Sequence, residues 1–133
     1  MTSIEELYDE VRTALVQKDY DALRRVADEL KTFGTTQATA LAALAEGSVL
    51  CFCGETNQAR VLLSSAVEMF EQLEDREGMA RAYNCLARVS KVTGDATAAM
   101  QEYRRARALL EEIDDPTGQA AVIGHIGTVY REL

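Results

Sequence analysis

The sequence predicts an all-α fold, an α-solenoid built from antiparallel helix hairpins. The first observation behind this prediction is internal repetition, because Gly54-Glu55 and Gly94-Asp95 lie 40 residues apart and much of the surrounding sequence matches at that offset. Further pairs at this offset are Ala59 and Ala99, Ala66 and Ala106, Leu73 and Ile113, Asp75 and Asp115, Gly78 and Gly118, and Ala80 and Ala120. A fixed period of this size is typical of repeat arrays, in which each unit buries its apolar face against its neighbours.

The second observation is composition. The 133 residues are 47% hydrophobic, lack Trp and include a single Pro. Ala and Leu dominate, with charged residues between them, which is typical of packed helices rather than sheets. A chain of this length can bury a continuous core, so we expect a single domain over residues 1–133.

Seven helices are predicted, separated by short breakers. They span residues 3–17, 19–33, 36–53, 56–73, 78–93, 95–113 and 115–133. The first begins with a capping box formed by Ser3 and Glu6. The second presents one apolar face and ends at Gly34, and the third ends at Gly54.

Polar residues mark the boundaries of the later helices. A charged link, 74–77, separates the fourth helix from the fifth. The seventh begins with Asp115 as its N-cap and Pro116 at the first helical position, where a missing N–H costs nothing. Because the connections are short, neighbouring helices pack antiparallel. The predicted hairpins are 3–33, 36–73 and 78–113, followed by an unpaired or capping helix.

The apolar positions of these hairpins resemble those of tetratricopeptide repeats. The first-helix signature of that family, with Ile in place of Trp and Leu, is matched in the seventh helix by Ile123, Ile126, Gly127 and Tyr130. In the fifth and third helices the same positions hold Tyr83, Leu86 and Ala87, and Ala43, Gly47 and Leu50. The second-helix pattern of small, large and small residues is present as Ala59, Leu63 and Ala66, and as Ala99, Tyr103 and Ala106. Small residues let the two helices approach closely, and the large residue fills the gap between hairpins.

The resemblance implies an interaction module. The 40-residue period is similar to that of kinesin light chains, Pins-type polarity adaptors and bacterial regulators of the Rap and PlcR kind. Such arrays usually hold extended peptides in a concave groove lined by the first helix of each hairpin. Glu10 and Glu46 stand where the family pattern has Leu, and Ser90 stands where it has Tyr. These departures imply looser packing in the first two hairpins.

The period also bears on the extent of the chain. Adding 40 to Gly94 gives position 134, one residue past the end of the sequence, so we expect the N-terminal fragment of a longer protein. The alternative is a complete protein capped by its seventh helix, although a cap has a polar outer face. The seventh helix is apolar at Ala120, Val122, Ile123, Ile126, Val129 and Tyr130. Its predicted self-association residues, for a homodimer, are Ile123, Ile126, Val129 and Tyr130.

The charge of the chain argues against several classes of partner. Its net charge is −8 and its sequence pI is near 4.7, the opposite of a surface that binds nucleic acid or an anionic membrane. The longest uncharged stretch, 32–45, is too short to span a bilayer, and the N-terminus has no basic region or apolar signal core. Cys51, Cys53 and Cys85 lie in apolar helical stretches, which favours reduced thiols and a cytoplasmic location.

No catalytic pattern is present, so we expect no enzyme activity, cofactor or metal. Cys51 and Cys53 point about 200° apart on one helix and cannot share a metal. The acidic run 111–115 is interpreted as a solvated helix end. Cys85 and His125 occupy equivalent positions on adjacent first helices, where a thiol–imidazole dyad could form. Because the pattern has no orienting group or oxyanion donor, His125 is interpreted as a groove-lining or core residue.

The candidate site is a basic stripe on the fifth helix. Its members follow at i, i+3, i+7 and i+10, share one helix face and are Arg81, Asn84, Arg88 and Lys91. In the family register this face lines the groove, where three cations suit an acidic peptide or a carboxylate terminus and Asn84 bonds backbone amides. The alternative is a solvated face balanced by acidic neighbours such as Glu102. The predicted peptide-binding residues are Arg81, Asn84, Arg88, Lys91, His125, Arg131, Leu44 and Ser48.

The sequence therefore predicts a protein–protein interaction module that binds an extended, acidic segment of a partner in its concave groove. An alternative is a self-associating sensory module that dimerises a downstream signalling or DNA-binding domain through the seventh helix. A third, sensing of a small molecule or signal peptide, is compatible with the Rap-like resemblance but has no specific residue behind it.

Overall fold

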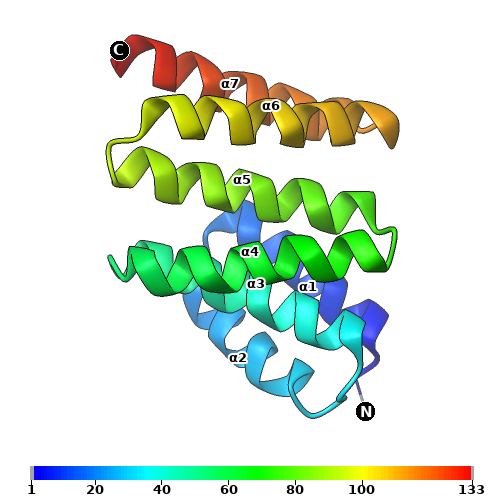
Figure 1. Ribbon diagram of the computed structural model, residues 1–133. Coiled ribbons are helices and arrows are strands. Elements are labelled where there is room, and N and C mark those ends of the chain that lie inside the picture. Colours follow the sequence, from blue (N-terminus) through cyan, green and yellow to red (C-terminus); the bar gives the residue numbers. More distant parts are fainter. Residues whose placement is uncertain (1, 133) are drawn as a thin grey trace.

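The computed structural model describes residues 2–132, apart from the side chains of Thr117, Tyr130 and Glu132. Within that range the chain forms seven α-helices and no strand. They are α1 Ile4–Gln17, α2 Tyr20–Leu30, α3 Thr36–Phe52, α4 Thr56–Gln72, α5 Arg76–Val92, α6 Ala96–Glu112 and α7 Pro116–Glu132. Figure 1 shows the helices stacked from α2 at the bottom of the view to α7 at the top. None of the described helices combines the length and apolar character that crossing a bilayer requires.

The helices from α3 onward follow a uniform step. Each of them contains 17 residues. Successive helices begin 20 residues apart, at Thr36, Thr56, Arg76, Ala96 and Pro116. Two such steps make one hairpin and produce the 40-residue offset in the sequence. The predicted all-α solenoid of helix hairpins is therefore confirmed.

The odd-numbered and even-numbered helices form two layers. Consecutive helices pack against one another along the whole stack, and α3 also contacts both α1 and α5. In the view of Figure 1, α4 and α6 lie in front, whereas α1 lies behind α3 and α4. A solenoid bends toward the layer whose helices approach one another more closely. The layer that contains α1, α3 and α5 is therefore the inner face.

Each turn contains one residue with a left-handed backbone conformation. In the turns before α4 and α6 this residue is a glycine, Gly54 with φ of 84° and Gly94 with φ of 87°, which adopts the conformation without strain. In the turns before α5 and α7 it is Glu74 with φ of 55° and Asp114 with φ of 56°. The recurrence of this conformation every 20 residues ends the helices at equivalent places.

Small residues permit the close helix approach that the sequence pattern predicts. A Cβ atom on Gly47 of α3 would lie 2.5 Å from Cγ of Leu63, and a Cβ atom on Gly78 of α5 would lie 2.3 Å from Cδ1 of Phe70. Interiors packed to crystal-like density leave no room for such an atom. The residues of the small–large–small patterns are all buried, namely Ala59, Leu63, Ala66, Ala99, Tyr103 and Ala106.

The start of α5 differs from the predicted boundary. This helix begins at Arg76, inside the predicted link, because Asp75 caps it and accepts a hydrogen bond from the Gly78 N–H at 3.0 Å. Asp115 accepts a hydrogen bond from the Gly118 N–H at 3.0 Å in the same way, so the predicted N-cap of α7 is confirmed. Equivalent aspartates thus start both helices.

The junction between the first two hairpins differs from the predicted one and borders a groove. The helix α2 ends at Leu30 rather than Phe33, because the Phe33 N–H bonds the Leu30 carbonyl in a turn at 3.1 Å. Glu46, a departure from the family pattern, forms an ion pair with Lys31 just beyond α2. A groove of about 640 Å³ lies between α2, α3 and α4 beside Glu46.

One side of the last helix is packed against α6. Val122 and Val129 are 3% and 1% exposed, and Ile126 is partly buried in the same cluster. Val129, predicted as a self-association residue, is instead part of the α6–α7 contact. Ile123 is 48% exposed, and the Tyr130 side chain lies outside the described residues.

We expect Gly47→Ala to lower the free energy of unfolding by about 1–3 kcal/mol, because the new methyl group overlaps Leu63 in a packed interface. Gly124→Ala is the matched control, since nothing lies within 4 Å of a Cβ atom at that position in α7. The higher helix propensity of Ala is expected to raise the free energy of unfolding there by about 0.5–1 kcal/mol. Urea denaturation followed by circular dichroism measures both effects. Similar effects of the two substitutions would contradict the close approach of α3 and α4.

Candidate ligand-binding site on the inner face

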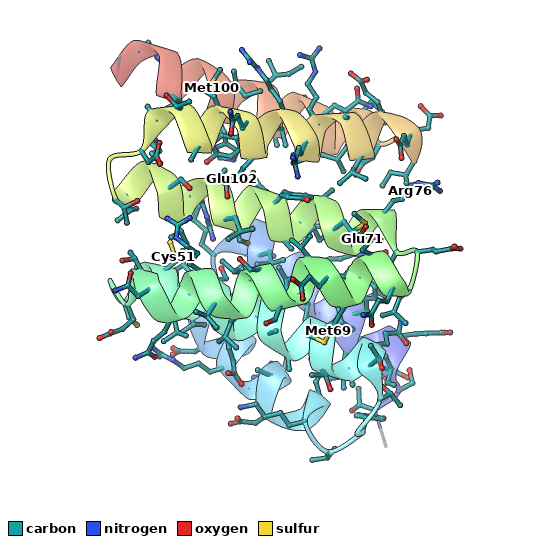
Figure 2. The ribbon with its side chains drawn as sticks, viewed as in Figure 1. Cys51, Met69, Glu71, Arg76, Met100 and Glu102 are labelled. Atoms are coloured by element: carbon teal, nitrogen blue, oxygen red, sulfur yellow. The ribbon has the colours of Figure 1, made fainter. Side chains whose placement is uncertain are left out.

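The basic stripe predicted on α5 is divided between two environments. Arg81, in the first half of the helix, donates from Nε to Oε2 of Glu77 at 3.0 Å. Its charge is therefore already balanced within the chain. Arg88 lies in the second half of α5. In Figure 2, Arg76 and Cys51 lie at opposite edges of the stack. Arg76 marks the edge where α5 starts, and Cys51 marks the edge where α3 ends.

Glu77 is the centre of a contact between α1 and α5. Arg12 of α1 binds it side-on, with distances of 2.5 Å from Nε to Oε2 and 2.9 Å from Nη2 to Oε1. Tyr8, one turn earlier, donates its hydroxyl to Oδ2 of Asp75 at 2.8 Å. We call Tyr8, Arg12, Asp75, Glu77 and Arg81 the α1–α5 clasp. Its bonds from α1 join residues 65 and 67 positions apart.

The clasp favours the ionised form of its central carboxylate. Burial acts to raise the pKa of Glu77, but hydrogen bonds from Arg12 and Arg81 outweigh burial and hold this pKa below its ordinary value. Burial and the hydrogen bond to Asp75 raise the pKa of Tyr8. The phenol therefore stays protonated and remains a hydrogen-bond donor in the clasp.

The first hairpin covers the inner face of α3. Leu41 and Leu44 of α3 are fully buried in the same core as Leu7 and Val11 of α1. Leu44, predicted to line the groove, is instead a core residue, because α1 packs over it. The uncovered part of the inner face that we describe therefore lies over α5 and α7.

Arg88 is a largely buried cation with an incomplete set of partners. Its Nη2 donates to Oγ of Ser48 at 2.9 Å, and Ser48 is 1% exposed. Its Nε is buried and has no hydrogen-bond partner among residues 2–132. One turn earlier on α5, the buried Oδ1 of Asn84 also lacks a partner in this range. We call Ser48, Asn84, Arg88, Lys91 and His125 the inner-face cluster.

Thiol and phenol groups lie around the Arg88 guanidinium. The Cys85 thiol contributes most to raising the pKa of Arg88, against the opposing effect of burial, and Tyr20, Cys51 and Tyr103 contribute in the same direction. Burial raises the pKa of the Cys51 thiol. Arg88 therefore keeps its positive charge, and no ion pair among the described residues neutralises it.

His125 of α7 belongs to the same region. Its ring stacks on that of Tyr103 from α6, with ring centroids 5.5 Å apart and an interplanar angle of 13°. Burial lowers the pKa of His125, and the positive charges of Arg88, Lys18 and Lys91 lower it further. The imidazole is therefore uncharged at pH 7.

The remaining candidates lie apart from this cluster or have other partners. Arg131 is exposed and bonds Oγ1 of Thr128 at 3.4 Å within α7. Glu102, considered as a counter-charge to the stripe, instead accepts a hydrogen bond from Ser90 at 2.5 Å, and burial raises its pKa. No group of three metal-binding side chains occurs in the part of the chain that the structure describes.

Sequence reasoning omitted Lys18 and Tyr103 from the site. Tyr103 was predicted to fill the gap between hairpins, and the same register places its ring between α5 and α7, beside His125. Lys18 is the left-handed residue of the turn after α1, with φ of 57°. Its approach to the cluster depends on the tilt of the first hairpin, for which the sequence has no periodic signal.

We expect Glu77→Gln to lower the free energy of unfolding at pH 7 by about 1–3 kcal/mol, because two charge-assisted hydrogen bonds lose their anionic acceptor. The folded-state pKa of Glu77 is lowered, so its stabilisation is present above the unfolded pKa of about 4.3 and is lost as the pH falls below that value. Urea denaturation at pH 7 and near pH 4 measures the difference.

Glu71→Gln on α4, where the side chain is exposed, is the matched control and is expected to change stability by less than about 0.5 kcal/mol. A loss for Glu77→Gln that is equally large at both pH values would contradict an ionic clasp.

Comparison of the chain with protein-family models, with curated proteins and with solved structures finds no match. A functional interpretation therefore depends on the fold and on the inner-face cluster themselves.

Proposed function

We propose that the protein is a tetratricopeptide-type interaction module that binds an acidic segment of a partner protein on its inner face. The segment lies over α5 and α7, with one carboxylate on Arg88. The observation that carries this proposal is the largely buried Arg88 guanidinium, whose Nε has no partner among the described residues.

The environment of Arg88 favours binding of an anion. A buried donor without an acceptor costs about 1–3 kcal/mol, and more when it is charged, because folding removes its hydration. A carboxylate that binds the accessible part of the guanidinium accepts a charge-assisted hydrogen bond and offsets part of this cost on binding. Ser48 holds Nη2 at 2.9 Å and so restricts the orientation of the guanidinium before the ligand arrives.

Asn84 suits the backbone of the same ligand. Its Oδ1 is an unpartnered acceptor among the described residues, one turn before Arg88, and a peptide N–H is a donor of the required kind. An extended peptide offers carbonyl and N–H groups to such a pair. Lys18 and Lys91 act on the same region electrostatically, which creates a local attraction for acidic segments in a chain of net charge −8.

The repeat architecture supports the same proposal. The uniform helix step and the buried small–large–small patterns are features that tetratricopeptide arrays share. Free thiols at Cys51, Cys53 and Cys85 fit a reducing, cytoplasmic setting. Self-association through α7 has less support, because Val129 and Ile126 pack on α6.

We expect Arg88→Gln to weaken binding of a synthetic hexaglutamate peptide at least about tenfold, because a hydrogen bond to a charged group is worth about 1.5–3 kcal/mol. This peptide supplies carboxylates on a flexible, extended backbone. Isothermal titration calorimetry at low ionic strength measures the affinity, since salt screens the interaction.

Arg107→Gln is the matched control. It removes the same charge from α6, where Arg107 pairs with Glu111 at 3.4 Å, and it should leave the affinity unchanged. Arg88→Gln should fold without a large loss of stability, because removal of the unpartnered, buried Nε offsets the loss of the hydrogen bond to Ser48. Equal binding by the wild type and both variants would contradict the proposal.

A further inference from the structure

The position of His125 suggests a link between ligand binding and pH. We propose that His125 takes up a proton when an acidic ligand occupies the inner-face cluster, so that the affinity for such a ligand rises as the pH falls. This inference rests on the proposed function and adds a form of regulation to the same site.

Groups from three elements act on the His125 ring. Tyr103 of α6 stacks on the ring, with centroids 5.5 Å apart, and holds it in a fixed orientation. Arg88 and Lys91 act on it from α5, and Lys18 acts on it from the turn after α1. The ring is partly exposed, so a proton can reach it from solvent. His125 thus lies in a cationic region whose positive field a bound anion would weaken.

The free protein disfavours the imidazolium ion for two reasons. Burial removes part of its hydration, and the positive charges of Arg88, Lys18 and Lys91 repel it, so the pKa of His125 lies below its ordinary value. Both effects act on the charged form of the ring alone. At neutral pH the site therefore contains an uncharged imidazole among cations.

Binding of carboxylates weakens the repulsion between the imidazolium ion and the surrounding cations. An anion on Arg88 offsets the positive field at His125, and opposite charge within about 4–6 Å raises a histidine pKa by about one unit or more. Linkage then requires the reciprocal effect on the ligand. A pKa rise of one unit on binding makes the affinity up to tenfold higher below both pKa values than above them. The expected window lies between about pH 7 and pH 5, around the ordinary histidine pKa.

The experiment uses a convenient property of this chain, which contains a single histidine. The imidazole proton signals in an NMR pH titration of the wild-type protein therefore report His125 alone. We expect their midpoint to lie below the ordinary pKa of about 6.5 in the free protein and to rise by about one unit with saturating hexaglutamate. Calorimetric titration with the same peptide should show a several-fold rise in affinity from pH 7.5 to pH 5.5, because the full tenfold change is reached only well below both pKa values.

Variants of His125 and Arg88 test whether the pH dependence of binding comes from the proposed coupling, with a variant of Arg107 as the control. His125→Gln should lose most of the difference in affinity between the two pH values, whatever its affinity at pH 7.5. In the absence of ligand, Arg88→Gln should raise the His125 midpoint, because it removes a facing cation, whereas Arg107→Gln on α6 should not. An unchanged midpoint in ligand-free Arg88→Gln would overturn the coupling.

The outcomes also distinguish this inference from the proposed function. If hexaglutamate binds and Arg88→Gln abolishes binding, but the His125 midpoint does not move, the inference fails and the proposed function stands. If the wild-type protein does not bind hexaglutamate at either pH, both fail.

Discussion

The equal step from one helix to the next is the constraint on which the rest of the structure depends. Because α3 to α7 begin at 20-residue intervals, residues 40 positions apart lie at equivalent heights on neighbouring inner helices. Ser48 and Arg88 are such a pair. They lie 40 residues apart in the sequence, and their side chains form a 2.9 Å hydrogen bond. The distance between neighbouring helices depends in turn on the close packing at Gly47 and Gly78, where no larger side chain fits. Helix spacing in the core therefore also sets the geometry of the inner-face cluster.

Most of the fold could be predicted because every unit from α3 onward obeys the same local rules. Asp115 was recognisable as an N-cap, and the same rule applied to Asp75, its counterpart at the 40-residue offset, places the start of α5 correctly. An interpretation of residues 74–77 from their charge alone misses this cap. The end of α2 had no comparable support, because the first hairpin, with helices of 14 and 11 residues, departs from the regular step.

The candidate site shows where sequence periodicity is insufficient. Spacing on α5 indicates that Arg81 and Arg88 share one helix face, but it does not show which of them is already neutralised. That difference depends on Glu77 and on Arg12, which lies 65 residues away from Glu77 and reaches it only because α1 crosses over α3. The burial of Leu44 has the same origin. Contacts set by the tilt of a terminal hairpin follow from packing of whole elements, and no local pattern encodes them.

The position of α1 also limits how many residues of a proposed ligand can contact the described part of the inner face. Because α1 covers α3, a segment bound as proposed passes over α5 and α7. An extended chain advances about 3.3 Å per residue, so several residues of the segment are needed to pass from α5 to α7. Under the proposed function, the ligand is a short linear motif. Discrimination between partners then depends on the identity and order of a few side chains, and a long interface is not required.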